Sequence, residues 1–440
     1  MTSTMNRRLT VVGRLTFFIV TIGLALPSQV ALAERTATSP CGAHADSLEV
    51  TDFGAKGDGS SDNLESFKAA LAYASHCSVP QVHVPAGTYA FVPTGAAAGL
   101  LLPSNIALVG DGIGKTVLQV TAGKPGANFD SLLWARNQDN IQIRGMTMVG
   151  NNIVVNNASG QPLNTYGTAI SIALDEKPGA PAFGTPRDLK QFTIADCQFE
   201  NFNGAAWLRV TNYHPSYVIS NIEIRHNMFR SHAGNAVNPS NIGFTSFAIQ
   251  VTGSRTSAAG LVKGVRISGN NIEATHIKGG VGIYAGVADA VIAENTIVNA
   301  GADASIPDDR GAYAISVYQN AYRYDQGQAV MLGGAAPDDV HIERNVITRP
   351  RSCGIYTAAV NRVWVVGNKI SGQTDGNNQT LPKGAIVMNH PTEGTVTDNQ
   401  LSSNHIGMSV LTDAKGRVAA SNNNISDVPR GGVATVAPQR

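Results

Sequence analysis

The chain has 440 residues, of which only 14% are charged, and its formal net charge at pH 7 is +1. This balance argues against nucleic acid or an acidic membrane surface as the partner. With 46 glycines and 6% aromatic residues, the composition is typical of a turn-rich β protein with a slim core, and helical periodicity is nearly absent.

Residues 1–33 have the features of an export signal peptide. Arg7, Arg8 and Arg14 precede the apolar run 15–26, which is followed by a small-residue cleavage site at 31–33. The residues around Arg7 and Arg8 fit a twin-arginine signal poorly, so general secretion is favoured. We therefore expect a secreted or periplasmic protein that begins near Glu34, with no membrane partner after signal removal, because no other apolar stretch is long enough to cross one.

The cysteines leave two arrangements open. In an oxidising compartment Cys41 and Cys77 could pair, which would tie the N-terminal extension 34–49 to the first helix. Cys197 and Cys353 lie far apart in the sequence. Four buried thiols are the alternative, and neither arrangement makes a metal site.

The segment 50–91 predicts a helix between two extended stretches. Asp62 follows a run of turn-forming residues and is suited to cap this helix. A stack of β-coils exposes apolar core and unpaired strand edges at its ends, so we expect the helix to cover the N-terminal end of such a stack. The apolar side of the helix is formed by Leu64, Phe67, Leu71, Tyr73 and Ala74.

From residue 192 onward one short phrase recurs: an apolar residue, two variable residues, Asn, one variable residue and another apolar residue. Such a recurrence indicates one structural unit stacked on itself, and thus a single body over residues 50–440. We predict that the first five Asn side chains stack in a column and bond to turn backbone or to one another, because buried polar groups need such partners. The phrase is centred on Asn227, Asn270, Asn295 and Asn345, in weaker form on Asn368, Asn399 and Asn423, and has Cys197 in the Asn place.

Two further motifs carry a family resemblance. Val50-Thr-Asp-Phe-Gly-Ala-Lys-Gly-Asp-Gly59, the helix after it and Val84-Pro-Ala-Gly-Thr-Tyr89 resemble the first coil of the pectate-lyase-like superfamily. With the Asn phrases, the resemblance covers nearly all of the mature chain. It implies an all-β fold, a right-handed single-stranded parallel β-helix with an N-terminal capping helix over 50–91. The superfamily includes pectin and alginate lyases, polygalacturonase-type hydrolases, uronan epimerases and phage tailspikes, so fold does not settle function.

Each coil carries a second phrase with an inward pair of apolar residues, such as Leu208 and Val210. The residue before the first of the pair is Ala or Gly in seven of eight coils, Gly282 before Ile283 among them. Alternation along a strand would place this residue outside, so we predict an outward row of small side chains that forms a shallow trough. A crowded sheet is the other explanation. The exception in the row is Trp207, a candidate substrate-binding residue.

The next outward row is rich in hydrogen-bonding and aromatic groups. It contains Arg209, Gln250, Tyr284 and Tyr356, and Tyr318 follows one strand-spacing further along. Sugar hydroxyls need hydrogen bonds and sugar rings stack on aromatic faces, so this row favours a polysaccharide as the partner. Exposed tyrosines on strands are also common without any ligand.

Long connections cluster around the strands from Arg209 to Ser316. The segments 208–227, 249–270 and 315–345 are longer than the later segments 355–368 and 386–399. Compact folds rarely keep such loops without a use, so we place the site there. The loops carry His214, His232, His276, Lys278, Asp308, Asp309, Arg310, Tyr322 and Arg323.

Two reactions fit these residues. A glycoside hydrolase needs two carboxyl groups flanking the bond, and Asp308 with Asp309 resembles the paired Asp of polygalacturonase-type hydrolases, although the other motifs of that family are missing. A lyase needs a base and a cation that neutralises the uronate carboxylate. Arg209, Arg310 or Arg323 could be that cation, with Tyr284, Tyr318, His214 or Lys278 as the base. Asp308 and Asp309 could instead bind Ca²⁺, the one cofactor considered.

Basic and phenolic residues outnumber carboxylates, so the sequence favours a β-eliminative lyase that acts on a uronate-containing polysaccharide. The alternatives are a glycoside hydrolase, a C5-epimerase that shares the first step of the lyase, and a non-catalytic glycan-binding β-helix. We expect the catalytic candidates to converge on one groove roughly 15 Å long, about three strand spacings. The catalytic candidates are Arg209, Tyr284, Asp308, Asp309, Arg310 and Tyr318, and the substrate-binding candidates are Trp207, His214, Gln250, Lys278, Tyr322, Arg323 and Tyr356.

Overall fold

Residues from Leu48 onward form a right-handed parallel β-helix, in agreement with the fold that the sequence predicts. The structure is a computed structural model. It describes residues 35–41, 46–94, 96–97, 99–122, 127–151, 167–175, 184–204, 206–231, 247–254, 261–303, 312–319, 321–325, 328–332, 335–374, 384–389, 391–404, 408–411, 417–427 and 433–436.

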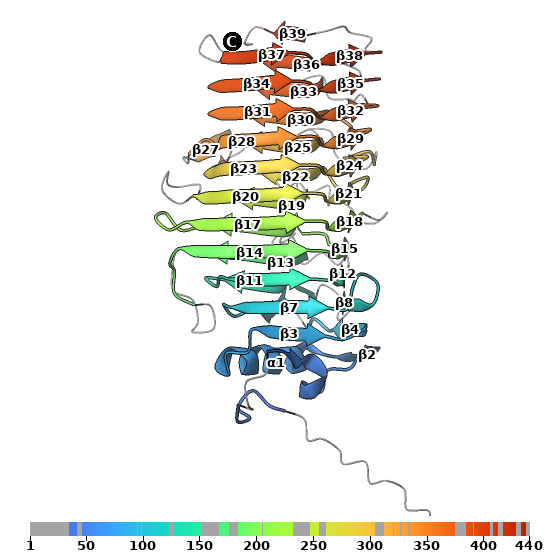
Figure 1. Cartoon of the computed structure of the whole chain (residues 1–440), viewed down its shortest axis with the longest axis vertical. Helices are drawn as coiled ribbons and strands as arrows, with labels where there is room; N and C mark the ends of the chain where they lie inside the picture. The colour runs from blue at the N-terminus through green and yellow to red at the C-terminus, as the bar shows by residue number, and fades with distance from the viewer. Residues whose placement is uncertain are drawn as a thin grey trace, which may run out of the picture. The chain divides into compact units, whose positions relative to one another are not determined.

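Each coil passes in turn through three parallel sheets, here called sheets 1, 2 and 3 (Figure 1). Sheet 1 consists of β6 (Leu100–Leu101), β10 (Ser131–Arg136), β13 (Thr168–Leu174), β16 (Ala206–Asn212), β19 (Phe247–Thr252), β22 (Gly279–Ile283), β25 (Tyr313–Tyr318), β30 (Cys353–Ala358), β33 (Gly384–Asn389), β36 (Met408–Leu411) and β39 (Val433–Val436). Sheet 2 consists of β1 (Leu48–Glu49), β3 (Gln81–Val84), β7 (Ile106–Gly110), β11 (Ile141–Arg144), β14 (Leu189–Ala195), β17 (Ile219–Arg225), β20 (Val262–Ser268), β23 (Val287–Ala293), β28 (Asp338–Glu343), β31 (Arg362–Val366), β34 (Glu393–Thr397) and β37 (Arg417–Ser421). Sheet 3 consists of β2 (Asp58–Asp62), β4 (Gly87–Phe91), β8 (Thr116–Val120), β12 (Thr147–Val149), β15 (Gln198–Glu200), β18 (Met228–Arg230), β21 (Asn271–Glu273), β24 (Thr296–Val298), β29 (Val346–Thr348), β32 (Lys369–Ser371), β35 (Gln400–Ser402) and β38 (Asn424–Ser426).

The remaining elements lie outside these sheets. A short pair joins β5 (Ala96–Ala97) to β9 (Asn128–Phe129). An antiparallel hairpin joins β26 (Ala321–Asp325) to β27 (Gln328–Leu332). The 3-10 helix η1 (Val50–Phe53) and the α-helix α1 (Leu64–His76) precede the first complete coil. None of the helices in the described ranges is long and apolar enough to cross a membrane.

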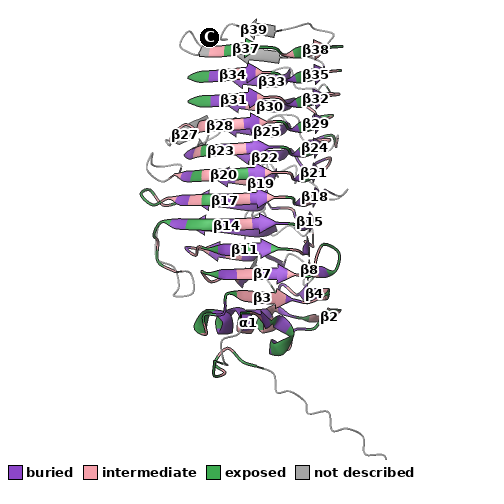
Figure 2. Ribbon diagram, viewed as in Figure 1, coloured by how far each residue is buried: buried purple, intermediate pink, exposed green. Residues whose placement is uncertain are grey.

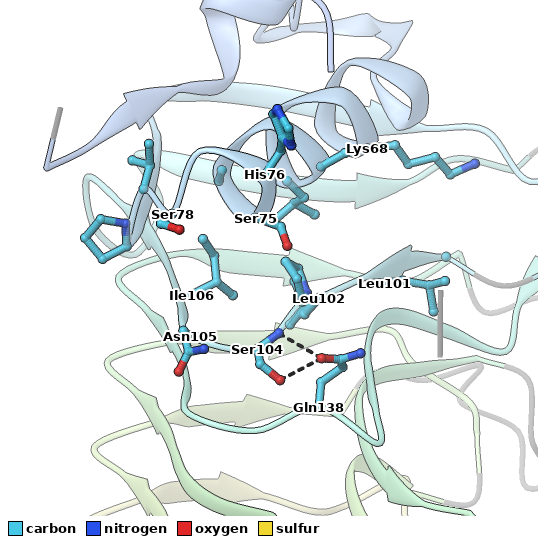
Figure 3. A pocket seen from close by; sticks show the side chains of 17 residues that line it. Lys68, Ser75, His76, Ser78, Leu101, Leu102, Ser104, Asn105, Ile106 and Gln138 are labelled. Atoms are coloured by element: carbon cyan, nitrogen blue, oxygen red, sulfur yellow. Dashed lines mark hydrogen bonds between the residues drawn. The ribbon is translucent and has the colours of Figure 1, made fainter. Parts of the chain in front are cut away.

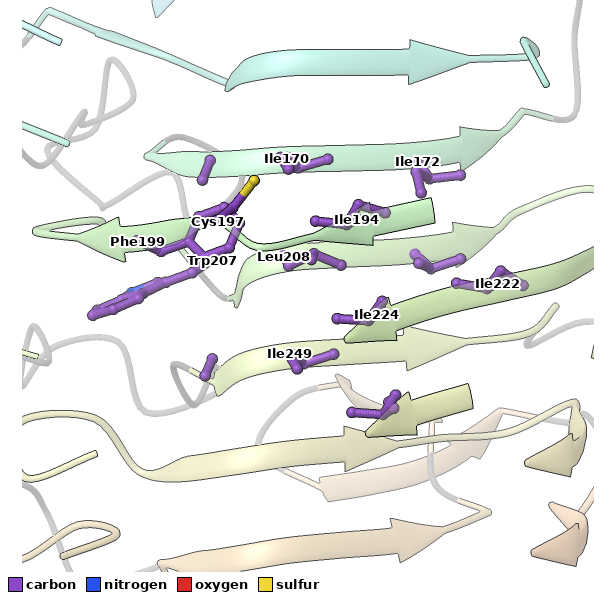
Figure 4. Close-up of a cluster of buried hydrophobic side chains, with 14 of the residues drawn as sticks. Ile170, Ile172, Ile194, Cys197, Phe199, Trp207, Leu208, Ile222, Ile224 and Ile249 are labelled. Carbon is purple, nitrogen blue, oxygen red and sulfur yellow. The ribbon is translucent and has the colours of Figure 1, made fainter. Parts of the chain in front are cut away.

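The interior is a stack of apolar side chains that every coil repeats. Leu208 and Ile249 of sheet 1 meet Ile222 and Ile224 of sheet 2, and all four are at most 1% exposed (Figure 4). Complete burial of one such side chain contributes about 1.5–3 kcal/mol. The inward apolar pairs of the sequence therefore fix the register of the strands.

The predicted Asn column is confirmed at the corner between sheets 2 and 3. The Oδ1 atom of Asn270 accepts the backbone N–H of Asn227 at 2.9 Å and its side-chain Nδ2 at 3.0 Å, and Asn295 does the same for Asn270. The pattern continues through Asn345 and on along the stack. Cys197 takes part through its backbone N–H, which donates to Asn227 Oδ1. Each Asn side-chain oxygen thus accepts hydrogen bonds from the Asn, or from Cys197, of the preceding coil. Each side-chain amide group donates hydrogen bonds to nearby carbonyl groups. The column extends through Asn368, Asn399 and Asn423.

The predicted trough of small side chains is wrong, because this row faces the interior. Ala169, Ala248 and Ala314 are fully buried in the core. A Cβ atom on Gly354 would lie 2.6 Å from Cγ2 of Ile370, a core side chain of sheet 3. Alternation fails here because the first residues of each sheet 1 strand still turn past the corner with sheet 3, where space is narrow.

Trp207 belongs to the same inward row. It is fully buried and its ring packs 6.5 Å from those of Phe202 and Phe229. Figure 4 shows it beside Phe199 in the core. The prediction that Trp207 binds substrate is therefore wrong, since the large ring fills the interior of one coil instead.

The N-terminal helix forms at the predicted place. Its buried side consists of Phe67, Ala70, Leu71, Tyr73 and Ala74, which join the core. Asn63, not Asp62, is the residue before the first turn, although Asp62 Oδ1 accepts the N–H of Leu64 at 3.2 Å. Cys41 and Cys77 form a disulfide, whereas Cys197 and Cys353 are buried and take no part in it. That α1 protects the end of the stack stays a prediction.

Candidate functional site

The outer faces of sheets 1 and 2 differ in burial. Strand β17 of sheet 2 alternates buried with more exposed residues, as expected for a solvated face (Figure 2). Strands β13 and β16 of sheet 1 are buried at every residue. At these two strands the outer face of sheet 1 is therefore buried, whereas Gln250, Tyr318 and Tyr356 on later strands are partly exposed.

Strand pairing places the predicted outward row on this face, with one correction. Arg209 pairs with Ser171 and Gln250, and Ser316 pairs with Tyr356. Between Gln250 and Ser316 lies Gly282, not Tyr284. The strand 279–283 offers two apolar residues for the inward position, and Val281 takes the place that the sequence assigned to Ile283. Tyr284 consequently continues the neighbouring row of Thr252 and Tyr318.

Two glycines on β22 make room for aromatic rings that lie across the sheet. A Cβ atom on Gly282 would lie 2.8 Å from the hydroxyl of Tyr284, and one on Gly279 would lie 2.1 Å from Cε1 of Phe247. The two rings meet edge to face with centroids 6.0 Å apart. Gly282 thus lets the phenol of Tyr284, which is 4% exposed, fold back over its own strand.

Four tyrosines from successive coils form one cluster on this face. The rings of Tyr284 and Tyr318 meet at 4.6 Å and their hydroxyls are hydrogen-bonded, and Tyr313 stacks on Tyr356 at 4.6 Å. Burial, followed by the neighbouring Tyr284 phenol, raises the pKa of Tyr318 well above its usual value. The Tyr318 phenol is therefore protonated at neutral pH, and its hydroxyl is a hydrogen-bond donor.

Arg209 lies on the other side of Gln250, in a buried polar cluster that the sequence did not reveal. Its Nη2 lies 3.3 Å from Ser171 Oγ and 3.6 Å from Asp130 Oδ1. Burial raises the pKa of Asp130, and the positive charge of Arg209 opposes that rise. In this cluster the buried atoms Thr168 Oγ1 and Arg209 Nε make no hydrogen bond among the described residues.

The structure brings together only part of the predicted site. Tyr284 and Tyr318 are in contact, and strand pairing places Gln250 between the row positions of Arg209 and Gly282. Lys278 is buried three residues ahead of Val281. His214 lies in the turn after β16, where its Nδ1 accepts the backbone N–H groups of Ser216 and Tyr217. Asp308, Asp309 and Arg310 lie outside the described residues, as do the side chains of Tyr322 and Arg323 on β26.

A histidine–carboxylate pair lies where the chain turns from sheet 3 into sheet 1. His276 Nδ1 lies 2.7 Å from Asp303 Oδ2. The two residues belong to successive coils, in the turns that follow β21 and β24. His276 was among the loop residues that the sequence pointed to, but its partner was missed because no sequence spacing connects the two turns.

A pocket of about 880 Å³ separates α1 from the first coil. Lys68, Ser75 and His76 line it from the helix, and Leu101, Ser104 and Gln138 line it from the coils (Figure 3). Gln138 Oε1 accepts hydrogen bonds from the backbone N–H and hydroxyl of Ser104. Leu101 pairs with Trp134 of sheet 1. The pocket therefore adjoins the N-terminal end of sheet 1, apart from the tyrosine cluster.

The described residues offer no ligand set for a metal. Their one group of three ligand side chains is Cys41, His76 and Cys77. The two cysteines are joined in a disulfide, which removes the thiolates that a metal would need. The predicted Ca²⁺ ligands, Asp308 and Asp309, lie outside the described residues.

Comparison with solved structures supports the fold. PfbA, a surface adhesin of Streptococcus pneumoniae, superposes with a TM-score of 0.55 at 16% identity, over 89% of this chain and 94% of that one. At this identity the likeness concerns the fold alone.

Comparison of the sequence identifies relatives and a family. Mannuronan C5-epimerase AlgE1 of Azotobacter vinelandii is 40% identical over 78 residues, 17% of this chain and 6% of that protein. Alginate lyase 7 of the same organism is 37% identical over 76 residues, 17% of this chain and 9% of that protein. The matched segment thus spans less than a tenth of either relative. A family model described as rhamnogalacturonase A/epimerase, pectate lyase-like, matches residues 47–320. Since this match covers more than half of the sequence, the chain belongs to the rhamnogalacturonase A/epimerase family of pectate-lyase-like proteins.

Proposed function

We propose that the protein is a carbohydrate-active enzyme that cleaves a uronate-containing polysaccharide by β-elimination on the outer face of sheet 1. The family, and relatives named for an alginate lyase and a mannuronan epimerase, support a uronate polymer as the substrate. The features of residues 1–33 support action outside the cytoplasm after signal removal.

The observation that carries this proposal is the buried guanidinium of Arg209. In β-elimination the proton α to the uronate carboxylate is removed, and negative charge spreads onto that carboxylate. A fixed cation in a site with little water stabilises this charge far more than it would in solution. Arg209 is 8% exposed, and within the described part of the chain its Nε makes no hydrogen bond, which leaves that donor for the carboxylate.

The tyrosine cluster supplies the second requirement of the reaction. As the double bond forms between C4 and C5, the bond from C4 to the glycosidic oxygen breaks and that oxygen must take a proton. Tyr318 is only partly exposed, and its phenol is protonated at neutral pH like that of any tyrosine, so it has a proton to donate to this oxygen. A hydrogen bond between Tyr318 and Tyr284 holds the two phenols together.

C5-epimerisation is the second candidate, because 78 residues match an epimerase at 40% identity. An epimerase removes the same proton but returns one to the opposite face of the sugar, and the glycosidic bond survives. Arg209 would stabilise the same intermediate in both reactions, so product analysis must separate them.

The test is to incubate purified residues 34–440 with alginate and with polygalacturonate. Absorbance of unsaturated uronate and the number of new reducing ends are measured, together with the epimer ratio by proton NMR. We expect one unsaturated end for each new reducing end. Reducing ends without absorbance would indicate a hydrolase, a changed epimer ratio without cleavage an epimerase, and no change in any product a binding protein. A chelator added in parallel tests for Ca²⁺ at Asp308 and Asp309.

A further inference from the structure

Elimination needs a base, and the predicted bases of the tyrosine cluster and the turn after β16 are poorly placed for that role. The pKa of Tyr318 is raised by burial, so its phenolate is scarce at neutral pH. The Nδ1 of His214 already accepts two backbone N–H groups.

The structure points to His276 instead: we propose that His276 is the general base of the reaction and that Asp303 positions it. This inference rests on the proposed function. Its geometric basis is a carboxylate 2.7 Å from Nδ1, which holds the ring with Nδ1 as the donor and leaves Nε2 as the acceptor. Among the described residues no hydrogen bond occupies Nε2.

Two other histidines in the described ranges, His341 and His83, lack this arrangement. His341 has both ring nitrogens next to carboxylates, Glu343 at 3.1 Å and Asp339 at 3.2 Å. His83 likewise lies between Glu49 at 3.3 Å and Asp111 at 2.8 Å. A ring with both nitrogens occupied has no lone pair free to take a proton from a substrate. His276, with one carboxylate and one open nitrogen, has that lone pair.

Neighbouring turns hold the pair in place. The backbone N–H of His276 donates to Ser231 Oγ at 3.1 Å, and that hydroxyl donates to Glu273 at 2.7 Å. The backbone N–H of Asp303 donates to the carbonyl of Thr275 at 2.9 Å. Because the bonds connect three successive coils, the imidazole and its carboxylate are positioned by the scaffold before substrate binds.

The pair also lies beside the proposed groove. His276 precedes Gly279, the first residue of β22, by three residues, which is at most about 10 Å of chain. Strand β22 carries Gly282 and leads into Tyr284. Both side chains are accessible, with 23% of His276 and 27% of Asp303 exposed. The imidazole therefore lies near the edge of sheet 1 that is nearest sheet 3.

The proposed β-elimination conserves protons and electrons. His276 Nε2 takes the proton from C5, and the electrons of that bond form the C4–C5 double bond while the C4–O bond breaks. The departing oxygen receives its proton from the phenol of Tyr318. The imidazolium, stabilised by Asp303, then returns its proton to water or to the phenolate, so that no redox partner is needed.

The test begins with His276→Ala, assayed with and without imidazole on a uronate polymer that the wild type cleaves. We expect kcat to fall by about 10²–10⁴-fold, the usual contribution of a general base. Free imidazole should restore part of the loss, because it replaces the missing base and not a missing structural contact. His341→Gln is the matched control and should keep full activity. A His276→Ala variant that is fully active would overturn the assignment, and so would a folded, inactive variant that imidazole does not rescue.

The role of Asp303 is tested by introducing Asp303→Asn into both the wild type and the His276→Ala variant and comparing the two losses of activity. Asp303→Asn should lower kcat by about 10–10²-fold in the wild type and have no further effect in His276→Ala, because Asp303 acts only through the imidazole. An equal loss in both backgrounds would show a separate role for Asp303. If the wild type cleaves none of the uronate polymers, the proposed function fails first. If it cleaves them without His276, only the present inference fails.

Discussion

The corner between sheets 2 and 3 differs from the outer face of sheet 1 in how its polar residues vary from coil to coil. At the corner the coils from Asn227 to Asn423 repeat the same Asn, and the side-chain amides bond to the adjacent coils. On the outer face of sheet 1 the residue changes at every coil, from Ser171 to Arg209 and Gln250. Some buried polar atoms there, such as Arg209 Nε and Ser316 Oγ, make no hydrogen bond among the described residues.

This difference indicates that the Asn column serves stability and that the varied row serves function. A repeated polar residue with all its bonds made contributes to folding and has no capacity left for a ligand. A varied row with buried donors and acceptors left open costs stability, and natural proteins retain such groups mainly where they bind or react. The predictions below test this division.

The largest effect on stability is expected from Asn295→Ala in the middle of the column. The change leaves the N–H of Asn270 and the carbonyl of Ile267 buried without their partner. Each such group costs about 1–3 kcal/mol, so the free energy of unfolding should fall by about 3–5 kcal/mol. Urea denaturation measures it. A loss below 1 kcal/mol would show that the column is not a major source of stability.

Gly282→Ala should affect activity more than stability. Its methyl group would lie 2.8 Å from the Tyr284 hydroxyl and displace it from Tyr318. We expect kcat to fall by about 10–10²-fold with the fold retained, as when a positioned proton donor is misaligned. In a Tyr284→Phe background the same change should cost much less. Thr395→Ala on sheet 2, between the positions of Trp364 and Ala419, is the control and should have little effect. Equal losses in both backgrounds would exclude the Tyr284 hydroxyl as the cause.

Arg209→Ala should make stability depend more strongly on pH. Because burial raises the pKa of Asp130 in the folded state, its contribution to stability is fully present below the unfolded pKa of about 3.9 and is lost as pH rises through the folded pKa. Without the opposing charge of Arg209 that pKa rises further. The variant should therefore lose about 1–2 kcal/mol more at pH 7 than at pH 4. Adding Asp130→Asn should abolish the difference, and its persistence would point to another group.

The smallest effect is expected from Asn423→Ala at the last Asn of the column. Asn423 accepts from Asn399 and donates to the carbonyl of Val396, but this end of the column is more exposed. Water can replace the lost bonds, so the cost should stay at or below about 1 kcal/mol. Thermal or urea unfolding beside Asn295→Ala gives the comparison. Similar losses for both variants would contradict the role assigned to burial.

The same division explains what the sequence could predict. Asn227 and its equivalents were predicted because one turn recurs with one set of contacts. Trp207 was misplaced because strand alternation fails at the corner where the chain leaves sheet 3. Tyr284 was assigned to the wrong row because Val281 and Ile283 compete for one inward position. The His276–Asp303 contact joins turns of separate coils, and only the pitch of the fold brings them together.

The most direct test of the account compares Arg209→Ala with Arg266→Ala on a uronate polymer that the wild type cleaves. Arg266 lies on sheet 2, between the positions of Glu223 and Val291, and pairs with Asp289 at 3.1 Å. If the outer face of sheet 1 is the site, Arg209→Ala should lower kcat/KM by about 10²–10³-fold, as expected for loss of a buried charge that stabilises the transition state. Arg266→Ala should match the wild type. Full activity in a folded Arg209→Ala variant, or an equal loss in both variants, would contradict the account.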